Sequence, residues 1–304
     1  MDGRKPHTDA VSQALLVTFL WSTSFVIIKL GYRSHIPPLS FAGLRYGVAF
    51  LGLLAAVCHS EASRRALGSL SPRDCRRLLA FGLVYISLAQ GLQFMALAGM
   101  PAAAVSLILN LTPVIVGLLA SRSLGEQTSW TQWIGIGLTV FGALAYFVPC
   151  TGIEIGWLGL TSAVGALAAN AAGSLMGRWI NRETQLPPVV VTTASMGFGS
   201  VPLLLVGGAF QGFGGIGPRD CILIAWLALV NTALAFTLWN RSLKVLSAVE
   251  SSVINSTMLP QIALLSWVML GESLDARKLA ALAIATTGII LVQHQSAASP
   301  KRKY

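Results

Sequence analysis

The chain has 304 residues, of which 54% are hydrophobic and only 11% are charged, and its formal net charge is +10. Soluble domains carry about 25% charged residues, so this composition indicates a protein that lies in lipid and excludes an ordinary water-soluble domain. A cleaved secretory signal does not explain it, because the apolar runs recur along the whole chain.

Ten segments are apolar over the length that a membrane-spanning helix needs, which is about 20 residues. They cover residues 11–31, 38–58, 78–97, 101–121, 130–149, 157–177, 188–207, 220–240, 248–270 and 277–293. Runs this long and this continuously apolar lack the alternation of barrel strands. We therefore predict an all-α polytopic membrane protein with ten transmembrane helices.

The basic residues lie mainly on one side of the predicted spans. With the N-terminus in the cytoplasm, most of the 21 Lys and Arg residues fall on the cytoplasmic side. This is the positive-inside rule, and it predicts a cell-membrane protein with both termini in the cytoplasm. The positive charge is then explained by topology and by attraction to anionic lipid, so no nucleic-acid partner is expected. The four cysteines lack metal-ligand spacing, and neither a metal nor a cofactor is predicted.

Short motifs recur at a nearly constant offset. Pro-Arg-Asp-Cys stands at residues 72–75 and 218–221, and Leu-Gly-Glu stands at 124–126 and 270–272, each pair 146 positions apart. Pro113 and Pro260 are 147 apart, and the Pro-Pro pairs at 37–38 and 187–188 are 150 apart. These anchors predict two repeats, residues 1–149 and 150–304, of five helices each. Because five is odd, the second repeat is inverted, an arrangement typical of secondary transporters.

Several of these motifs together resemble a known family. Residues 20–29 read Leu-Trp-Ser-Thr-Ser-Phe-Val-Ile-Ile-Lys, and Gly-Leu-Arg-Tyr follows at 43–46. Leu-Thr-Pro at 111–113 leads to Gln-Trp-Ile-Gly at 132–135. The chain is similar to EamA-type members of the drug/metabolite transporter superfamily. The resemblance implies a ten-helix transporter of metabolites, often an exporter of amino acids or related compounds, and it leaves the substrate open.

Two basic residues, Lys29 and Arg45, remain within the predicted spans once Arg277 and Lys278, at the very start of the last span, are assigned to its outer flank. Arg45 lies about seven residues into its span, roughly 10 Å deep at 1.5 Å per residue. A central Arg costs about 2.5–3.5 kcal/mol on insertion scales, so we expect it to face a cavity and bind a substrate carboxylate or phosphate. The alternative is an Arg that snorkels outward or pairs structurally. Lys29 lies nearer the end of its span, where snorkelling is easier, and it matches the family pattern.

Side-chain amides form a second group of candidates near the middle of the spans. They are Gln90, Gln93, Asn110, Asn170, Asn231, Asn255 and Gln261. A cluster of amides at mid-depth predicts a polar cavity. The alternative for each amide is a hydrogen bond that joins two helices, worth about 0.6 kcal/mol on average.

Pro113 and Pro260 interrupt their helices near mid-depth. Broken helices at corresponding places in two repeats indicate the binding site of a transporter, although a packing kink is the alternative. Trp21 and Trp239 are further candidates for the cavity wall, and the alternative is a lipid-facing or interfacial position.

The acidic residues and the absent motifs narrow the function. Of the 11 acidic residues only Glu250 falls inside a predicted span, near its cytoplasmic end. Coupling through a mid-membrane carboxylate is therefore not indicated, and the coupling ion and the oligomeric state stay open. Hydrolase motifs such as H-E-x-x-H and G-x-S-x-G are absent, so an enzyme is not predicted. We predict alternating-access transport of a small metabolite, with efflux favoured; a lipid-linked flippase or a channel is the alternative.

Overall fold

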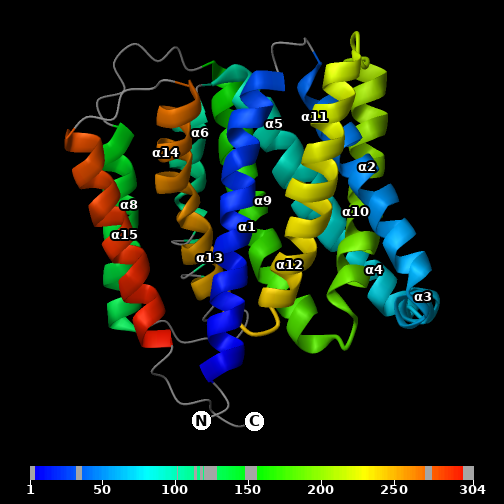
Figure 1. Ribbon diagram of the computed structural model, residues 1–304, viewed down its shortest axis with the longest axis horizontal. Coiled ribbons are helices and arrows are strands. Elements are labelled where there is room, and N and C mark those ends of the chain that lie inside the picture. The colour runs from blue at the N-terminus through cyan, green and yellow to red at the C-terminus, as the bar shows by residue number, and fades with distance from the viewer. Residues whose placement is uncertain are drawn as a thin grey trace.

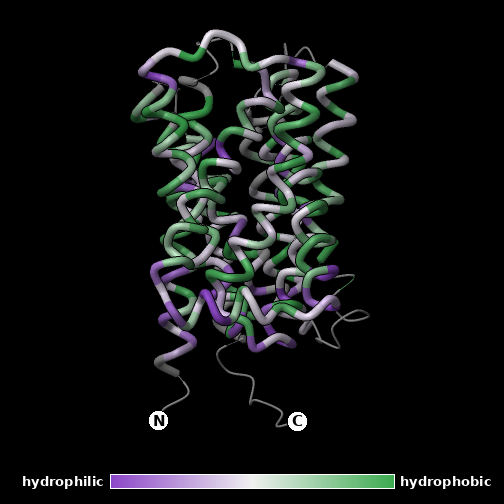
Figure 2. Tube along the Cα trace, turned by 90° about the vertical axis from the view of Figure 1, so that its right-hand side faces the viewer, coloured by the Kyte–Doolittle hydropathy of each residue, from purple (hydrophilic) through white to green (hydrophobic). Residues whose placement is uncertain are grey.

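The computed structural model describes residues 4–31, 36–100, 102–112, 115–116, 119, 129–147, 156–270 and 276–296. Every regular element in these ranges is a helix, and the helices stand side by side in one bundle (Figure 1). Six of them are long and apolar enough to cross a membrane, and Val253–Met269 is a shorter apolar helix. In Figure 2, hydrophilic residues gather at the end of the bundle where α1 begins. The prediction of an all-α polytopic membrane protein is confirmed.

The first repeat begins with α1 (Arg4–Gly31), α2 (Pro38–His59) and the short α3 (Glu61–Gly68). A continuous helix follows, formed by α4 (Pro72–Phe81), the π-helical segment η2 (Gly82–Leu88) and α5 (Ala89–Gly99). The repeat ends with α6 (Ala102–Leu109) and α8 (Trp130–Phe147). The third helix begins at Pro72, six residues before the predicted start, because its first turn is polar and extends beyond the apolar window.

The second repeat contains α9 (Trp157–Glu183) and α10 (Pro188–Phe210). Its third helix is formed by α11 (Pro218–Ala228), the π-helical segment η3 (Leu229–Leu234) and α12 (Ala235–Ser242). It ends with α13 (Ala248–Ser256), α14 (Met258–Leu270) and α15 (Ala276–Ser296). Apart from the short α3 of the first half, and from α14, whose counterpart lies outside the described residues, the order of elements repeats that of the first half.

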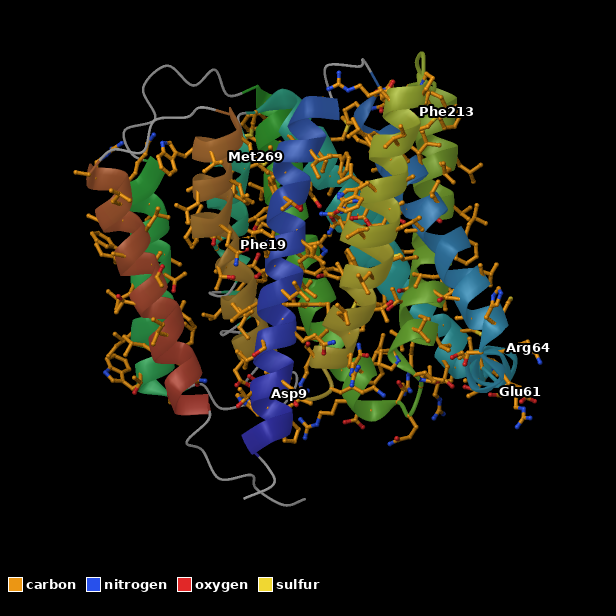
Figure 3. All side chains as sticks on the ribbon, in the orientation of Figure 1. Asp9, Phe19, Glu61, Arg64, Phe213 and Met269 are labelled. Atoms are coloured by element: carbon orange, nitrogen blue, oxygen red, sulfur yellow. The ribbon has the colours of Figure 1, made fainter. Side chains whose placement is uncertain are left out.

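The labelled side chains of Figure 3 show that the second repeat is inverted. Glu61 and Arg64, which lie between α2 and α4, are at the same end of the bundle as Asp9 of α1. Phe213, which lies between α10 and α11, is at the opposite end. Corresponding connections of the two repeats therefore lie at opposite ends, as the odd number of helices predicts.

The shared Pro-Arg-Asp-Cys motif begins the third helix of each repeat. Pro72 and Pro218 occupy the first helical positions, where a missing N–H is tolerated. The Ser71 hydroxyl accepts the N–H of Asp74 at 3.1 Å, and the Asp220 carboxylate accepts the N–H of Gly217 at 2.9 Å. The motif is a helix start and marks the register of the repeat.

Both third helices contain a π-helical segment at the same place. Shifted by 146 residues, η2 would cover residues 228–234, and η3 covers Leu229–Leu234. A π-helical turn adds a residue to the helix and displaces backbone hydrogen bonds, and such turns are frequent at functional sites.

The fourth helix of each repeat is interrupted by a turn of one or two residues, which we call the helix break. α6 ends at Leu109, and α13 ends at Ser256. At the breaks the N–H of Leu111 bonds to the carbonyl of Ile108 at 3.1 Å, and the N–H of Thr257 bonds to that of Ile254 at 3.0 Å. These two bonds are related by the same shift of 146 residues. Pro260 lies three residues beyond the second break, and Pro113 lies outside the described residues.

The last helices of the two repeats, α8 and α15, pack against each other at one edge of the bundle (Figure 1). Two glycines allow the close approach. A Cβ on Gly142 would lie 2.6 Å from the Ala285 nitrogen, and a Cβ on Gly288 would lie 2.5 Å from the Gly135 oxygen. Small residues at helix contacts are the usual means of close packing in membranes. The edge position leaves the first four helices of each repeat to form the centre.

Candidate substrate-binding site

A cavity lies in the middle of the bundle, between helices of both repeats. It holds about 790 Å³ of empty space, including the part that opens to solvent. The enclosed part is much smaller, about 80 Å³. This is below the roughly 300–1,000 Å³ of most small-molecule pockets, so the cavity is narrow in this conformation. Its wall comes from α1, α2, η2, α5 and the α6 break in the first repeat, and from α9, α12, α13 and α14 in the second.

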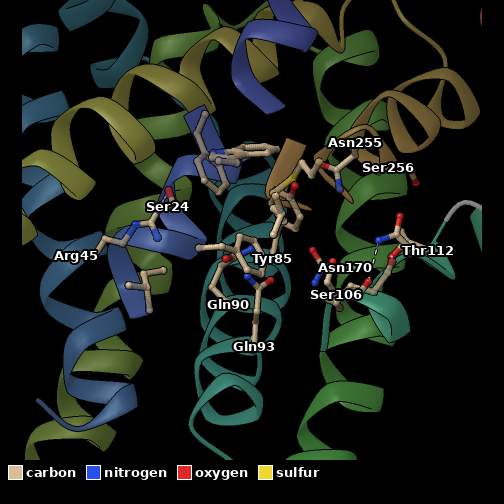
Figure 4. A pocket seen from close by; sticks show the side chains of 18 of the residues that line it. Ser24, Arg45, Tyr85, Gln90, Gln93, Ser106, Thr112, Asn170, Asn255 and Ser256 are labelled. Carbon is tan, nitrogen blue, oxygen red and sulfur yellow. Dashed lines mark hydrogen bonds between the residues drawn. The ribbon is translucent and has the colours of Figure 1, made fainter. Parts of the chain in front are cut away.

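Seven of the residues expected at a site line this cavity: Trp21, Arg45, Gln90, Gln93, Asn110, Asn170 and Asn255. In Figure 4, Arg45 and Ser24 lie on one side of the pocket, and Asn255, Ser256 and Thr112 lie on the other. Gln90 and Gln93 lie between them. Three further candidates, Asn231, Trp239 and Gln261, are not among the lining residues. The side chain of Lys29 is outside the described part of the chain, as is Pro113.

Arg45 is buried, with 4% of its surface exposed. Its Nε donates to the Thr232 hydroxyl at 2.7 Å, and its Nη2 donates to the Ser24 hydroxyl and to the Asn231 carbonyl, each at 3.3 Å. Thr232 and Asn231 both belong to η3, so the π-helical segment faces the guanidinium with a hydroxyl and a carbonyl oxygen. All three of these acceptors are neutral, and they hold the plane of the guanidinium against the cavity wall.

Asn231 lies behind the wall and joins two helices. Its Nδ2 donates to the Thr23 hydroxyl at 2.8 Å and to the carbonyl of Leu20. The amide therefore connects η3 to α1, which is the structural alternative considered for these residues. Its contribution to the site is indirect, through the backbone carbonyl that accepts from Arg45.

Gln261 also joins two helices, at the break between α13 and α14. Its Oε1 accepts from the Ser22 hydroxyl at 2.9 Å, and its Nε2 lies 3.2 Å from both the Thr18 and the Thr257 hydroxyls. These bonds connect α1 to α14. Pro260, its neighbour in α14, has no N–H to offer to the carbonyl four residues earlier, and this favours the break.

Aromatic rings form one wall of the cavity around Phe236 of α12. Its ring centroid lies 4.9 Å from that of Trp21, 5.8 Å from that of Tyr85 and 6.1 Å from that of Tyr46. Trp239 packs behind Trp21, with centroids 5.1 Å apart. The Tyr46 hydroxyl donates to the Gln90 oxygen at 2.9 Å, which fixes that amide at the edge of the wall.

The sequence analysis missed three of these aromatic residues, Tyr46, Tyr85 and Phe236. One signal could have found Phe236: it stands 146 residues after Gln90, so the two occupy corresponding positions of the repeat. Tyr85 corresponds in the same way to Asn231. Apolar rings in apolar spans carry no local sign of a cavity, and only the repeat register marks them.

Three polar atoms of lining residues are buried without a hydrogen-bond partner in the described protein. They are Trp21 Nε1, Asn110 Oδ1 and Asn255 Oδ1. An unsatisfied buried donor or acceptor costs about 1–3 kcal/mol, so a group that would satisfy it is expected. The cavity therefore offers one indole donor on α1 and two amide acceptors at the helix breaks.

Polar contacts join the two repeats at both ends of the bundle, beginning with the end where α1 begins. The His7 ring nitrogen lies 2.9 Å from Glu250 Oε1, and the Ser242 hydroxyl lies 3.4 Å from the Gln13 oxygen. Glu250 also accepts the N–H of Ser247 at 2.8 Å and so caps α13. At the opposite end, the N–H of Leu39 donates to the Gln211 oxygen at 2.9 Å, connecting α2 to the end of α10.

A solved crystal structure has the same fold, with a TM-score of 0.79, 17% sequence identity and coverage of 95% of this chain and 98% of that chain. A protein of Salmonella typhimurium named "Probable amino-acid metabolite efflux pump" is 28% identical over 91% of this chain and 92% of its own. Its namesake in Escherichia coli is 30% identical, over 58% of this chain and 56% of its own length.

A protein of Streptantibioticus cattleyicolor named "Probable terminal-alkyne amino-acid exporter" is 27% identical over 94% of both chains. The sequence pattern of the EamA-like transporter family matches residues 9–148 and again residues 157–293. Each match covers five predicted helices, in agreement with the repeat. The chain belongs to the EamA-like transporter family.

Proposed function

We propose that the protein exports a small carboxylate-bearing metabolite, an amino acid or a related compound, across the cell membrane. Three relatives of similar architecture carry names that describe amino-acid export or amino-acid metabolite efflux. The cavity is lined by polar and aromatic side chains, and both repeats contribute to its wall. The protein acts as a carrier and catalyses no covalent chemistry.

The observation that carries this proposal is the placement of Arg45. A guanidinium that is 4% exposed lies on the wall of a central cavity, with its plane held by neutral oxygens. The three bonds described above engage Nε and Nη2, so a substrate carboxylate would be met by the Nη1 group. Charge-assisted bonds of this kind are roughly twice as strong as neutral ones. Burial strengthens the attraction, since the field of a charge is screened less there than in water.

We infer alternating access from the symmetry. The two repeats, residues 1–149 and 150–304, exchange conformations, so that the closed end and the open end of the cavity change places. The contacts of His7 with Glu250 and of Gln13 with Ser242 hold the end that the positive-inside rule assigns to the cytoplasm. Breaking them opens the site to cytoplasmic substrate, the step that efflux requires.

The test is substitution of Arg45 in reconstituted vesicles. Removing one partner of a buried charged pair costs about 2–5 kcal/mol, so Arg45→Gln should reduce L-phenylalanine flux about 30-fold or more at low substrate. Arg45→Lys should recover only part of it, because an ammonium keeps the charge but cannot bond to Thr232, Ser24 and Asn231 in the planar geometry of a guanidinium. Flux of phenethylamine, which has the ring and the amine without the carboxylate, should change much less.

Equal retention of both fluxes in Arg45→Gln would contradict the role of Arg45. Flux that never saturates with substrate would favour a channel over a carrier. Transport restricted to large lipid-linked compounds would favour a flippase.

A further inference from the structure

The two helix breaks bring two helix C-termini to the same cavity. α6 ends at Leu109 and α13 ends at Ser256, and both residues line the cavity. The C-terminal end of a helix carries a partial negative charge from its carbonyl groups, which attracts cations. Half-helix ends of this kind bind cations in other transporter folds.

The side chains at the breaks are hydrogen-bond acceptors. Asn110, which is 7% exposed, donates its Nδ2 to the Ser106 carbonyl at 2.8 Å, and this bond fixes which way the amide is turned. Its Oδ1 is buried without a partner in the described protein, and so is the Oδ1 of Asn255. Two neutral oxygens are therefore available to a donor in the cavity, and Asn255 lies on the side of the pocket opposite Arg45 (Figure 4).

The positions are related by the repeat. Leu109 and Asn110 correspond to Asn255 and Ser256 under the shift of 146 residues, and all four line the cavity. Among the described lining residues none is Asp or Glu. A donor at this place therefore meets neutral oxygens and two helix ends rather than a carboxylate.

We propose that the two helix breaks form an ammonium-binding pole, so that the substrate is held as a zwitterion between this pole and Arg45. An ammonium group suits it because it brings three donors and a positive charge. The carboxylate end of this arrangement rests on the function proposed above. Because the amine and the carboxylate are bound at two separate places, the site favours compounds in which both groups are present and unmodified.

A sodium ion would be attracted by the same oxygens and helix ends. The two candidate cations differ in one respect. The ammonium belongs to the substrate, whereas a sodium ion binds independently of the substrate's amine. The test therefore needs substrates with and without the amine, each in the presence and absence of sodium.

The experiment measures binding to the full-length protein in detergent by titration calorimetry. The probes are L-phenylalanine and 3-phenylpropanoate, which share the ring and the carboxylate and differ in the amine. The aromatic wall around Phe236 is the reason for a ring in both. The wild type should bind phenylalanine about tenfold or more tightly than 3-phenylpropanoate, because hydrogen bonds to a charged group contribute about 1.5–3 kcal/mol.

Asn255→Leu should weaken phenylalanine binding until the two dissociation constants differ by less than about threefold. Its affinity for phenylpropanoate should stay at the wild-type value, which also shows that the variant is folded. Asn255→Asp should widen the difference beyond that of the wild type. Gln185→Leu removes an exposed amide between α9 and α10, outside the cavity, and is the control; the ratio of its two dissociation constants should equal that of the wild type.

Several outcomes would overturn the pole. The first is an unchanged ratio in Asn255→Leu, and the second is an equal loss of both affinities. A third is that sodium raises the affinity of the wild type for both ligands and that Asn255→Leu abolishes this rise. That result would assign the two amide oxygens to a metal ion. A wild type that binds neither compound would contradict the proposed function itself, and the zwitterion with it.

Discussion

The two repeats share their irregular backbone and differ in their chemistry. Both contain a π-helical segment in the third helix and a break in the fourth, in the same register. The side chains at corresponding positions are different: Arg45 corresponds to Ser195 under the shift of 150 residues, and Gln90 corresponds to Phe236 under the shift of 146.

This difference distinguishes the backbone features that both repeats need from the substrate-binding side chains that only one repeat needs. The two halves can exchange conformations only if their backbones bend at equivalent places, so the breaks and π-helical segments occur twice. A substrate is not symmetric, and the groups that bind it need to occur only once. The first repeat therefore supplies the guanidinium, and η3 of the second repeat supplies the oxygens that orient it.

The largest effect is expected from substitutions in the contact between α8 and α15, to which both repeats contribute a glycine. Gly142→Val and Gly288→Val should each lower the free energy of unfolding by about 3 kcal/mol, because overpacking of a close helix contact costs about 1–3 kcal/mol or more. The two effects should be similar, since each added side chain would strike the backbone of the partner helix. Thermal unfolding in detergent measures them.

Gly137→Val is the control in the same helix, because nothing lies within 4 Å of a Cβ at Gly137. A destabilisation by Gly137→Val as large as that by Gly142→Val would show that helix propensity, not the contact between α8 and α15, causes the loss.

The second prediction concerns the asymmetric part. Thr232→Val keeps the shape of the side chain and removes the acceptor for Arg45 Nε. Hydrogen bonds to charged groups are worth about 1.5–3 kcal/mol, so we expect roughly a tenfold rise in the KM for carboxylate substrates. The KM for phenethylamine should stay within about twofold, since that compound has no carboxylate for Arg45 to bind.

Thr237→Val is its matched control in the next turn, where the hydroxyl bonds only to the Ala233 carbonyl at 2.7 Å. If both variants raise the KM alike, the π-helical segment is not what positions Arg45.

The smallest effect is expected at the contact between His7 and Glu250, at the end of the bundle where α1 begins. Glu250 bonds to His7 of α1, whereas the corresponding residue of the first repeat, Ala104, has no polar side chain. Glu250→Gln replaces a charged acceptor by a neutral one and should cost about 1 kcal/mol of thermal stability. Adding His7→Gln to the Glu250→Gln variant should lower its thermal stability little further, because both changes remove the same interaction. Additive losses would mean that the two residues act separately.

The sequence predicted much of the fold and only part of the site. Apolar length predicts the spans, and the third helix begins earlier only because polar turns lie outside any hydropathy window. The proline positions place the helix breaks within a few residues. The π-helical segments have no signal of their own, because Gly82–Leu88 reads as an ordinary apolar run.

Two amides show why side-chain roles could not be predicted one by one. Asn231 and Gln261 look like Asn110 and Asn255 in the sequence, yet they bond to α1 and lie outside the cavity wall. Helical periodicity gives the angle of a residue around its own helix, not the direction of the neighbouring helices. The roles assigned to the seven lining residues, to Lys29 and to Pro113 stay predictions that transport measurements can test.

By itself the sequence determined that the protein lies in lipid, that it is all-α and that its motifs recur in two halves, because these depend on composition, on apolar length and on the register of the motifs. Only the tertiary structure decided which polar groups share the cavity and which join helices. The physical reason is that the packing of small residues sets how each helix is turned toward the others, as at Gly52 of α2, where a Cβ would lie 2.6 Å from the side chain of Leu229 in η3. The meeting of Arg45 with η3, across 186 and 187 positions of the chain, follows from that packing.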